Sequence, residues 1–316
     1  MLRSMIKQIG LWMFAYAVLL ALFLMPTTVS YQSSDIRGYF DGAEYNYSLK
    51  EHAEAIKEFA FYFVENKGLG HEANGDSILG IITDRAGRSL LLIVPALLIS
   101  FFIGITKGIF DYRTRTSVGK VPGKGMTWLS LSIPDMFFVL LIQISIIYVV
   151  YKGWLFHIDL FGSDKLENIL LCIVFLSIYP TAYIANVTFQ SLRDEEGLDY
   201  IRTAKSKGLS DFSIFYKHML KNGMAKILAH SNSMVLYLLS NLFIIEFFME
   251  YRGAAYYFKG ALGKPNVFMV GQSVSGVDVV YAAGYAFFFT VIILITNLVA
   301  EMAKRSVSPV KGGETG

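Results

Sequence analysis

The sequence predicts an all-α integral membrane protein with six transmembrane helices. Of its 316 residues, 54% are hydrophobic and only 17% are charged, whereas soluble globular chains carry about 25% charged residues. The apolar residues are concentrated in blocks, and a helix needs roughly 20 mainly apolar residues to cross the hydrocarbon core of a bilayer. Blocks of that length, separated by polar segments, favour a bundle of membrane-spanning helices over one large soluble core.

The predicted spans are residues 9–29, 88–106, 127–150, 167–189, 228–249 and 279–300. Arg3 and Lys7 precede the first span, as in a secretory signal, but residues 26–30 (PTTVS) make a poor cleavage site, so we expect a retained helix. The predicted organisation is an N-terminal transmembrane helix (1–29), an extracytoplasmic segment (30–84), a transmembrane core (85–303) and a cytoplasmic tail (304–316).

The Lys and Arg residues predict the orientation, because loops on the cytoplasmic side of a membrane are enriched in them. With the N-terminus inside, more than half of the 28 basic residues fall in cytoplasmic segments, seven of them between Arg193 and Lys226. The acidic residues have the opposite bias. We therefore expect a multi-pass membrane protein with both termini in the cytoplasm.

Cysteine and histidine give little sign of metal or redox chemistry. The single cysteine, Cys172, lies in an apolar run, so neither a disulfide framework nor a thiolate metal site is expected. His52 and His71 lie in the extracytoplasmic segment near acidic residues, but their spacing matches no trusted ligand pattern. We expect no metal site, no cofactor bound by this chain and no nucleic-acid partner.

The extracytoplasmic segment contains one predicted amphipathic helix. Ser48 and Glu51 form a capping box at its start, and Gly68 is the expected stop. Its apolar stripe consists of Leu49, Ala53, Ile56, Ala60 and Phe63. We expect the stripe to pack against the bundle, although the same surface could hold a substrate or a partner.

Several features near the spans bear on packing and on a pathway. Gly104 and Gly108 form a small-xxx-small pair, which permits close helix approach. The loop after them is basic and rich in glycine but lacks a phosphate-binding pattern, so we expect a solvated inner loop. Asp135, near the inner end of the third span, either lies at the interface or caps the helix. Glu246, near the outer end of the fifth span, either faces a cavity or a partner or reaches to the interface.

The longest polar run in the second half of the chain is residues 192–226. Glu195 and Glu196 would complement the positive end of a helix that starts near them. Gly208 is a natural helix end, and Ser210 is a natural N-cap for a second helix. The apolar face of that second helix is Phe212, Phe215, Met219 and Leu220. Either a docked protein or anionic lipid would cover this face.

Residues 199–222 (DYIRTAKSKGLSDFSIFYKHMLKN) resemble the cytoplasmic coupling loop of binding-protein-dependent ABC importer permeases of the dipeptide, oligopeptide and nickel type. Ala204, Gly208 and Leu220 fall at the family's places, and His218 and Asn222 fit its continuation. In that family the loop seats in a groove of the ATPase subunit. The residues to which the resemblance gives an ATPase-coupling role are Asp199, Arg202, Ala204, Lys205, Gly208, Leu209, Ser210, His218, Leu220 and Asn222.

The resemblance extends from about residue 84 to residue 301. Ile133-Pro134 opens the third span as in the family. Glu246 with Gly253 resembles a family segment that follows the fifth span, and Asn297 with Glu301 resembles a family segment near the end of the sixth span. The departures from the family pattern are Lys226 and Arg252 in place of prolines, Ala255 in place of a glycine, and an unusual tail at 308–310. These changes lie outside the expected ATPase contact. They affect which solute is expected and whether the chain transports at all.

The resemblance implies a type I ABC importer permease fold in the bacterial inner membrane, with a helical extracytoplasmic insertion between spans one and two. It also implies a non-enzymatic transport subunit for peptides or a similar small solute, with Glu246 and Asp135 as candidate pathway or gate residues. The implied partners are a homologous second permease, two ATP-binding subunits that hold ATP and magnesium, an extracytoplasmic substrate-binding protein and membrane lipid. The alternative is a membrane sensor or assembly factor that keeps the docking loop without transporting.

Overall fold

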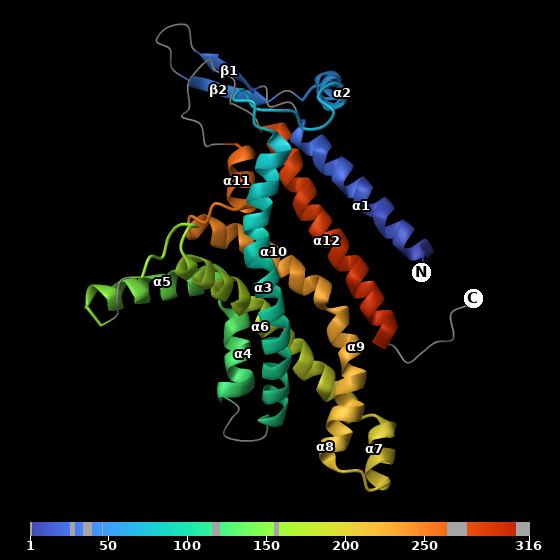
Figure 1. Cartoon of the computed structure of the whole chain (residues 1–316). Helices are drawn as coiled ribbons and strands as arrows, with labels where there is room; N and C mark the ends of the chain where they lie inside the picture. The colour runs from blue at the N-terminus through green and yellow to red at the C-terminus, as the bar shows by residue number, and fades with distance from the viewer. Residues whose placement is uncertain are drawn as a thin grey trace. The chain divides into compact units, whose positions relative to one another are not determined.

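The computed structural model is built almost entirely of helices, which confirms the predicted fold class (Figure 1). It describes residues 2–25, 29–33, 40–45, 47–115, 121–154, 158–263 and 277–307. In chain order the elements are α1 (Leu2–Phe23), β1 (Val29–Ser33), β2 (Phe40–Tyr45), α2 (Leu49–Glu65), α3 (Ile78–Arg113), η2 (Val121–Gly125), α4 (Met126–Ser132), α5 (Asp135–Tyr151), α6 (Leu166–Glu196), α7 (Asp199–Ser206), α8 (Asp211–Ser213), η3 (Ile214–Leu220), α9 (Lys221–Ala229), α10 (Ser231–Phe248), α11 (Ala254–Ala261) and α12 (Val279–Val307).

Five helices in the described part of the chain are long and apolar enough to cross a membrane: α1, α3, α6, α10 and α12. The consecutive pair α4 and α5 passes the same test together, so the total is six when this pair counts as one broken span. α3, α6 and α12 extend beyond the apolar blocks from which they were predicted, whereas α10 is shorter than its block and α1 ends before its predicted end. The second span, predicted at 88–106, is part of a helix of 36 residues.

The third span, predicted over 127–150, is a bent pair of helices. α4 and α5 meet at an angle of 105°. Ile133 at the break is extended, with φ −94° and ψ 132°, and Pro134 follows it. Proline has no N–H to donate, and its ring disfavours the helical conformation for the residue before it. The Ile133-Pro134 pair is therefore the physical cause of the bend.

The chain forms two compact units, and α3 and α12 contribute to both. Unit 1 comprises residues 1–89 and 252–291. In it, Tyr16 of α1 donates a hydrogen bond to the carbonyl of Ala283 in α12 (3.1 Å). The Ser89 hydroxyl of α3 accepts a bond from the amide of Ala254 at the start of α11 (2.7 Å). Aromatic pairs such as Phe258 with Phe289 (5.9 Å between ring centroids) add to this packing.

Unit 1 also contains a β-hairpin that the sequence analysis did not predict. β1 pairs with β2 in antiparallel register, with Val29 opposite Tyr45 and an irregularity after Gln32. The strands are only five and six residues long, and short segments of this kind carry a weak periodic signal. The insertion between the first two spans is therefore a strand pair followed by a helix.

The predicted helix of the insertion is α2, and its start is confirmed. Ser48 is the N-cap, and its hydroxyl accepts a hydrogen bond from the amide of Glu51 (3.3 Å). The helix ends slightly before the predicted stop. Lys67 takes the left-handed conformation (φ 52°), and the Gly68 amide bonds the Phe63 carbonyl (2.9 Å), as in a Schellman motif.

The predicted packing face of α2 is wrong. Leu49, Ile56 and Phe63 of the apolar stripe are exposed by 75%, 42% and 48%, and no residue of α2 is buried. The half-buried residues are His52, Ala55, Phe59 and Tyr62, which share another side of the helix. Hydrogen bonds made by His52 and Tyr62 hold this side against the chain, so polar contacts and not the apolar stripe set how α2 rests.

Unit 2 comprises residues 90–251 and 292–316 and is organised around α6. Helices α4, α9 and α10 all pack on α6. The predicted close approach at Gly104 and Gly108 is confirmed: α3 meets α6 there. A Cβ on Gly104 would lie 2.8 Å from Ile184, and one on Gly108 would lie 2.5 Å from the Ala185 carbonyl.

We predict that Gly108→Ala will destabilise unit 2. The new methyl group must displace the backbone of α6, and overpacking of this kind costs about 1–3 kcal/mol. Thermal unfolding of the purified chain in a fixed detergent measures the effect. The matched control is Gly87→Ala in the same helix, where a Cβ meets nothing within 4 Å. Equal melting temperatures for the two variants would contradict the α3–α6 contact.

Candidate functional site

The polar run at residues 192–226 folds into an ordered helical hairpin. α6 ends at Glu196, α7 begins at Asp199, and a tight turn leads into α8. Asp199 lies in the first turn of α7, where a carboxylate complements the helix dipole. The predicted role of Glu195 and Glu196 at a helix start is wrong, because both residues lie in the last turn of α6.

The predicted turn residues are confirmed in their local roles. Gly208 has φ +74°, a conformation that side chains other than glycine rarely adopt. Its amide bonds the Lys205 carbonyl (2.9 Å), and the Leu209 amide bonds the Ala204 carbonyl (3.3 Å). These two bonds form a Schellman motif. Two residues later, the Ser210 hydroxyl caps the next helix by accepting from the amide of Ser213 (3.3 Å).

The second arm of the hairpin is longer than predicted. α8, η3 and α9 follow one another without a break from Asp211 to Ala229, and η3 is π-helical. Inserted π turns are rare in proteins, and those that occur are often found at functional sites. Here the π turn lies between α8 and α9, the helix that packs on α6.

Most of the predicted apolar face is buried inside the chain itself. Tyr112 of α3, Phe189 and Leu192 of α6, Ile201 and Ala204 of α7, and Ile214, Phe215 and Met219 of η3 form one core cluster, which we call the hairpin root. Tyr200 and Leu220 pack against it. The ends of α3 and α6 therefore cover most of this apolar face, and only part of it remains exposed for a docked protein or lipid.

The tip of the hairpin remains exposed and combines apolar with basic side chains. Leu209, Phe212 and Tyr216 are 42%, 69% and 38% exposed. The rings of Phe212 and Tyr216 lie 4.5 Å apart, and Arg113 of α3 lies over Tyr216 at 5.5 Å. The exposed basic residues of the hairpin are Arg193, Arg202, Lys205, Lys207, Lys217, Lys221 and Lys226. We call the three exposed apolar residues, with the basic residues of 202–217, the hairpin tip.

A buried carboxylate ties the base of the hairpin together. Glu195, at the end of α6, accepts a hydrogen bond from the Tyr200 hydroxyl (2.5 Å) and pairs with Lys226 of α9 (3.2 Å). Burial, and then the hydrogen bond to Glu195, raise the pKa of the Tyr200 phenol to about 12. A hydrogen bond with Asn222 acts in the opposite direction and lowers this pKa. The phenol therefore stays protonated at neutral pH and keeps donating. Lys226, a departure from the family pattern, thus has a local partner.

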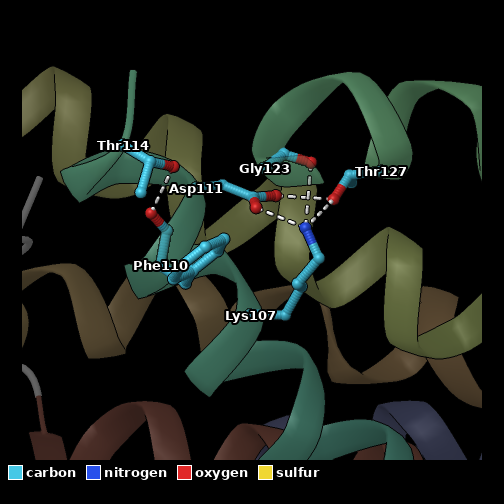
Figure 2. A network of polar contacts seen from close by, with 6 residues as sticks. All are labelled: Lys107, Phe110, Asp111, Thr114, Gly123 and Thr127. Carbon is cyan, nitrogen blue, oxygen red and sulfur yellow. Dashed lines mark hydrogen bonds and ion pairs between the residues drawn. The ribbon is translucent and has the colours of Figure 1, made fainter. Parts of the chain in front are cut away.

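The described part of the loop between α3 and α4 is mostly exposed, as predicted, but a polar network that was not predicted holds its buried Gly123. As Figure 2 shows, Lys107 bonds the Asp111 carboxylate, the Gly123 carbonyl (2.9 Å) and the Thr127 hydroxyl (3.1 Å). Thr127 in turn donates to Asp111 (2.5 Å), and Asp111 is 0% exposed. This network fixes η2 and the start of α4 to the end of α3. Residues 116–120, part of the predicted loop, lie outside the described residues.

Gly123 is required in this network. A Cβ there would lie 2.6 Å from the Thr114 hydroxyl, so a side chain would push the loop away from α3. Two cation contacts then join the same region to the hairpin. Lys124 lies 4.2 Å from the ring of Phe189 in the hairpin root, and Arg115 bonds Glu196 at 2.6 Å. The end of α3, the η2 loop and the hairpin base therefore form one connected region.

The two candidate pathway residues lie elsewhere. Glu246 is 0% exposed in α10, so the interpretation in which it reaches to the membrane interface is wrong. Asp135 is the first residue of α5 and Pro134 is its N-cap, so Asp135 does not occupy the cap position. The side chain of Asp135 lies outside the described residues. Nothing in the described geometry joins Asp135 and Glu246 into one site.

The predicted coupling residues divide into two groups. Asp199, Arg202, Lys205, Gly208, Leu209 and Ser210 are exposed on α7 and the turn. Ala204 is buried, and His218, Leu220 and Asn222 are half-buried, so these four support the hairpin from inside. The residues that sequence reasoning missed are Lys107, Asp111 and Thr127. Their signal was a Lys and an Asp four residues apart at the end of an apolar helix, where unpaired charges are costly.

Helical spans with one ordered polar hairpin define the chain as a multi-pass helical membrane protein whose organised polar surface lies at one end of α6. Comparison with known families gives a more specific answer. Residues 100–309 match the family described as binding-protein-dependent transport system inner membrane component. The chain belongs to this family and is a permease component of the ABC importer class.

Individual relatives agree with this assignment. The dipeptide transport system permease protein DppB of Bacillus subtilis is 24% identical over 322 aligned residues, which cover 98% of this chain and 97% of that protein. The protein of the same name from Haemophilus influenzae is 25% identical over 162 residues, 51% of this chain and 45% of its own length. An inward-facing structure of the MetNI methionine ABC transporter has a similar fold (TM-score 0.53, 14% identity, 72% of this chain, 96% of that chain).

We predict that Lys107→Met will be strongly destabilising, because it leaves the buried Asp111 carboxylate without its cation. Breaking a buried pair in this way typically costs about 3–5 kcal/mol. The double variant Lys107→Met/Asp111→Leu should recover much of the loss, since it removes the stranded charge. Thermal unfolding of the three proteins in one detergent tests the prediction.

The control for this experiment is Lys50→Met. Lys50 and Glu54 have the same spacing of four residues, and their charged atoms lie 4.0 Å apart. Unlike Lys107 and Asp111, their side chains are 86% and 59% exposed. Exposed pairs contribute about 0–1 kcal/mol. A Lys107 variant as stable as the Lys50 variant would contradict the structural role of the network.

Proposed function

We propose that the chain is one permease subunit of an ATP-driven importer of peptides or a similar small solute. Separate ATPase subunits would drive it by docking on the 192–226 hairpin. Family membership and a full-length relative named as a dipeptide permease support the solute class. The observation that carries the proposal is the hairpin itself, which combines a root buried in the chain with an exposed apolar and basic tip.

The hairpin has the mechanical properties that such coupling needs. An exposed tip with Leu209, Phe212 and Tyr216 offers apolar area for a protein groove, and basic side chains beside it add charge complementarity. The root joins η3 to Tyr112 of α3 and Phe189 of α6. A displacement imposed at the tip is therefore passed to two spans, because close-packed apolar contacts transmit movement instead of absorbing it.

The proposed assembly contains a homologous second permease, two ATP-binding subunits and an extracytoplasmic substrate-binding protein. ATP and magnesium would be held by the ATPase subunits, since the sequence contains no phosphate-binding loop pattern. The distribution of Lys and Arg supports an inner-membrane location with both termini in the cytoplasm. In that orientation the hairpin faces the compartment where ATP is available.

The proposed mechanism is alternating access. Closure of the ATPase pair would draw the hairpins of two permeases together, and rigid-body movement of the spans would open the solute cavity outward. ATP can shift this equilibrium only if it binds the two conformations with different affinity. The hairpin is the element that makes the ATPase state depend on the state of the spans.

We predict that Gly208→Val will uncouple the complex. The turn needs φ +74°, and a left-handed conformation costs an L residue roughly 1–2 kcal/mol, more for a β-branched one. A Cβ there meets nothing within 4 Å, so the effect is on the turn and not on packing. Solute uptake and solute-stimulated ATPase activity, measured in proteoliposomes with the partner subunits, should both fall at least several-fold.

The matched control is Gly197→Val in the same hairpin. Gly197 has φ −85° and likewise has nothing within 4 Å of a Cβ, so a side chain is tolerated. Normal uptake and normal ATPase stimulation in Gly208→Val would overturn the coupling role. If the unmodified chain binds the ATPase but no uptake is found for any peptide, the non-transporting alternative is the better function.

We also propose that Glu246 and Asp135 belong to the solute pathway or its gate. Glu246 is fully buried in this conformation, so it would meet solute only after the spans move. We predict that Glu246→Gln, which keeps the size of the side chain but removes its charge, will lower solute uptake while the complex still assembles. Asp135→Asn should also lower uptake. Co-purification with the ATPase and uptake are the two measurements. Uptake equal to wild type in both variants would remove these residues from the pathway.

A further inference from the structure

The apolar stripe of α2 is exposed in the part of the chain that the structure describes. Leu49, Ala53, Ile56, Ala60 and Phe63 all lie on one side of the helix, and all five are exposed. The stripe extends over 15 residues, and its first and last residues are about 21 Å apart along the helix at 1.5 Å per step. A row of exposed Leu, Ile and Phe side chains of this length marks an interaction surface and is not an ordinary scatter of surface apolar residues.

The helix cannot rotate to bury the stripe against the chain, because another side is already attached. His52 bonds the carbonyl of Ala21 in α1 (2.8 Å) and the Tyr47 hydroxyl (2.8 Å), and Tyr62 donates to the Leu69 carbonyl (2.9 Å). At roughly 100° per residue, this attached side and the stripe are neighbouring faces of the helix. The third face is mainly charged. It carries Lys50, Glu51, Glu54, Lys57 and Glu58, with the ring of Phe61 under Lys57.

The attachment also fixes the depth of α2. Ala21 lies in the last turn of α1, a helix long and apolar enough to span the membrane, and none of its 18-residue apolar window is buried. Leu22, next to Ala21, is 56% exposed and available to lipid. A helix bonded at that level lies where the hydrocarbon core meets the headgroups. In Figure 1, α2 is seen almost along its own axis while α1 runs across the picture, so α2 crosses the direction of α1.

We propose that α2 is an interfacial helix whose apolar stripe inserts into the lipid at the end of α1. A helix lying in the plane of the interface, with one apolar and one charged face, is a recognised mode of membrane association. The bond from His52 to Ala21 holds α2 at the end of the exposed surface of α1, so one lipid layer can cover that surface and the stripe. The ring of Phe63, 48% exposed, adds the aromatic character common at membrane interfaces.

The charge of α2 indicates which force drives the insertion. The helix carries Lys50 and Lys57 but four glutamates: Glu51, Glu54, Glu58 and Glu65. A negative helix gains nothing from anionic headgroups, so apolar burial and the tether to α1 must supply the binding. The association should therefore be insensitive to the anionic lipid content and to salt, unlike that of a basic amphipathic helix.

Spin labels distinguish lipid from water and from a protein partner. Ile56→Cys on the stripe and Glu58→Cys on the polar face are each labelled with a nitroxide in the full chain, reconstituted in vesicles of neutral lipid. The native Cys172 is buried, and the unsubstituted chain serves as the labelling blank. Oxygen dissolves in hydrocarbon whereas a nickel chelate stays in water, so the ratio of their collision rates reports the surroundings of each label.

We expect the oxygen-to-nickel collision ratio to be several-fold higher at position 56 than at position 58. The ratio should not change when a fraction of the neutral lipid is replaced by anionic lipid or when salt is added. Low collision rates with both reagents at position 56 would show that a second copy or another protein segment covers the stripe. A high nickel collision rate there would show that the stripe faces water. Either result would overturn the proposal.

Discussion

The hairpin root is the contact on which the organised polar end of this protein depends. It gathers Tyr112, Phe189 and Phe215 from three elements that are far apart in the sequence. Apolar burial stabilises by roughly 25 cal/mol for each Å² removed from water, and close packing gives the cluster little freedom to rearrange. Without the root, the hairpin would be two short amphipathic segments, and isolated helices of that length are marginal in water.

Polar contacts then decide how the surrounding segments attach to this root. Asp111 is buried and must be satisfied, and Lys107 and Thr127 do so while they fix the start of α4. Glu195 is satisfied by Tyr200 and Lys226 and closes the base of the hairpin. Both carboxylates lie next to the end of a span. The ends of these two spans are therefore each held by a buried carboxylate whose hydrogen bonds are satisfied.

Sequence reasoning succeeded where the determining forces are local. The Ser48 and Ser210 caps and the left-handed Gly208 follow from the backbone hydrogen bonds of a single turn, so a few neighbouring residues specify them. It failed at α2, where two hydrogen bonds from His52 to partners outside the helix selected the attached side. It also failed at the η2 loop, because the partners of Lys107 are contributed by residues up to 20 positions away.

The sequence by itself determined the membrane class, the number of spans, the turn of the hairpin and the family resemblance, because hydrophobic length, glycine geometry and a contiguous motif are local properties of the chain. Only the tertiary structure decided which faces are buried. Phe215 lies in the root whereas Phe212, three residues earlier, lies at the exposed tip. Glu246 is enclosed, although its position near a span end permitted exposure. Burial depends on what the rest of the chain brings alongside, and one segment of sequence does not contain that information.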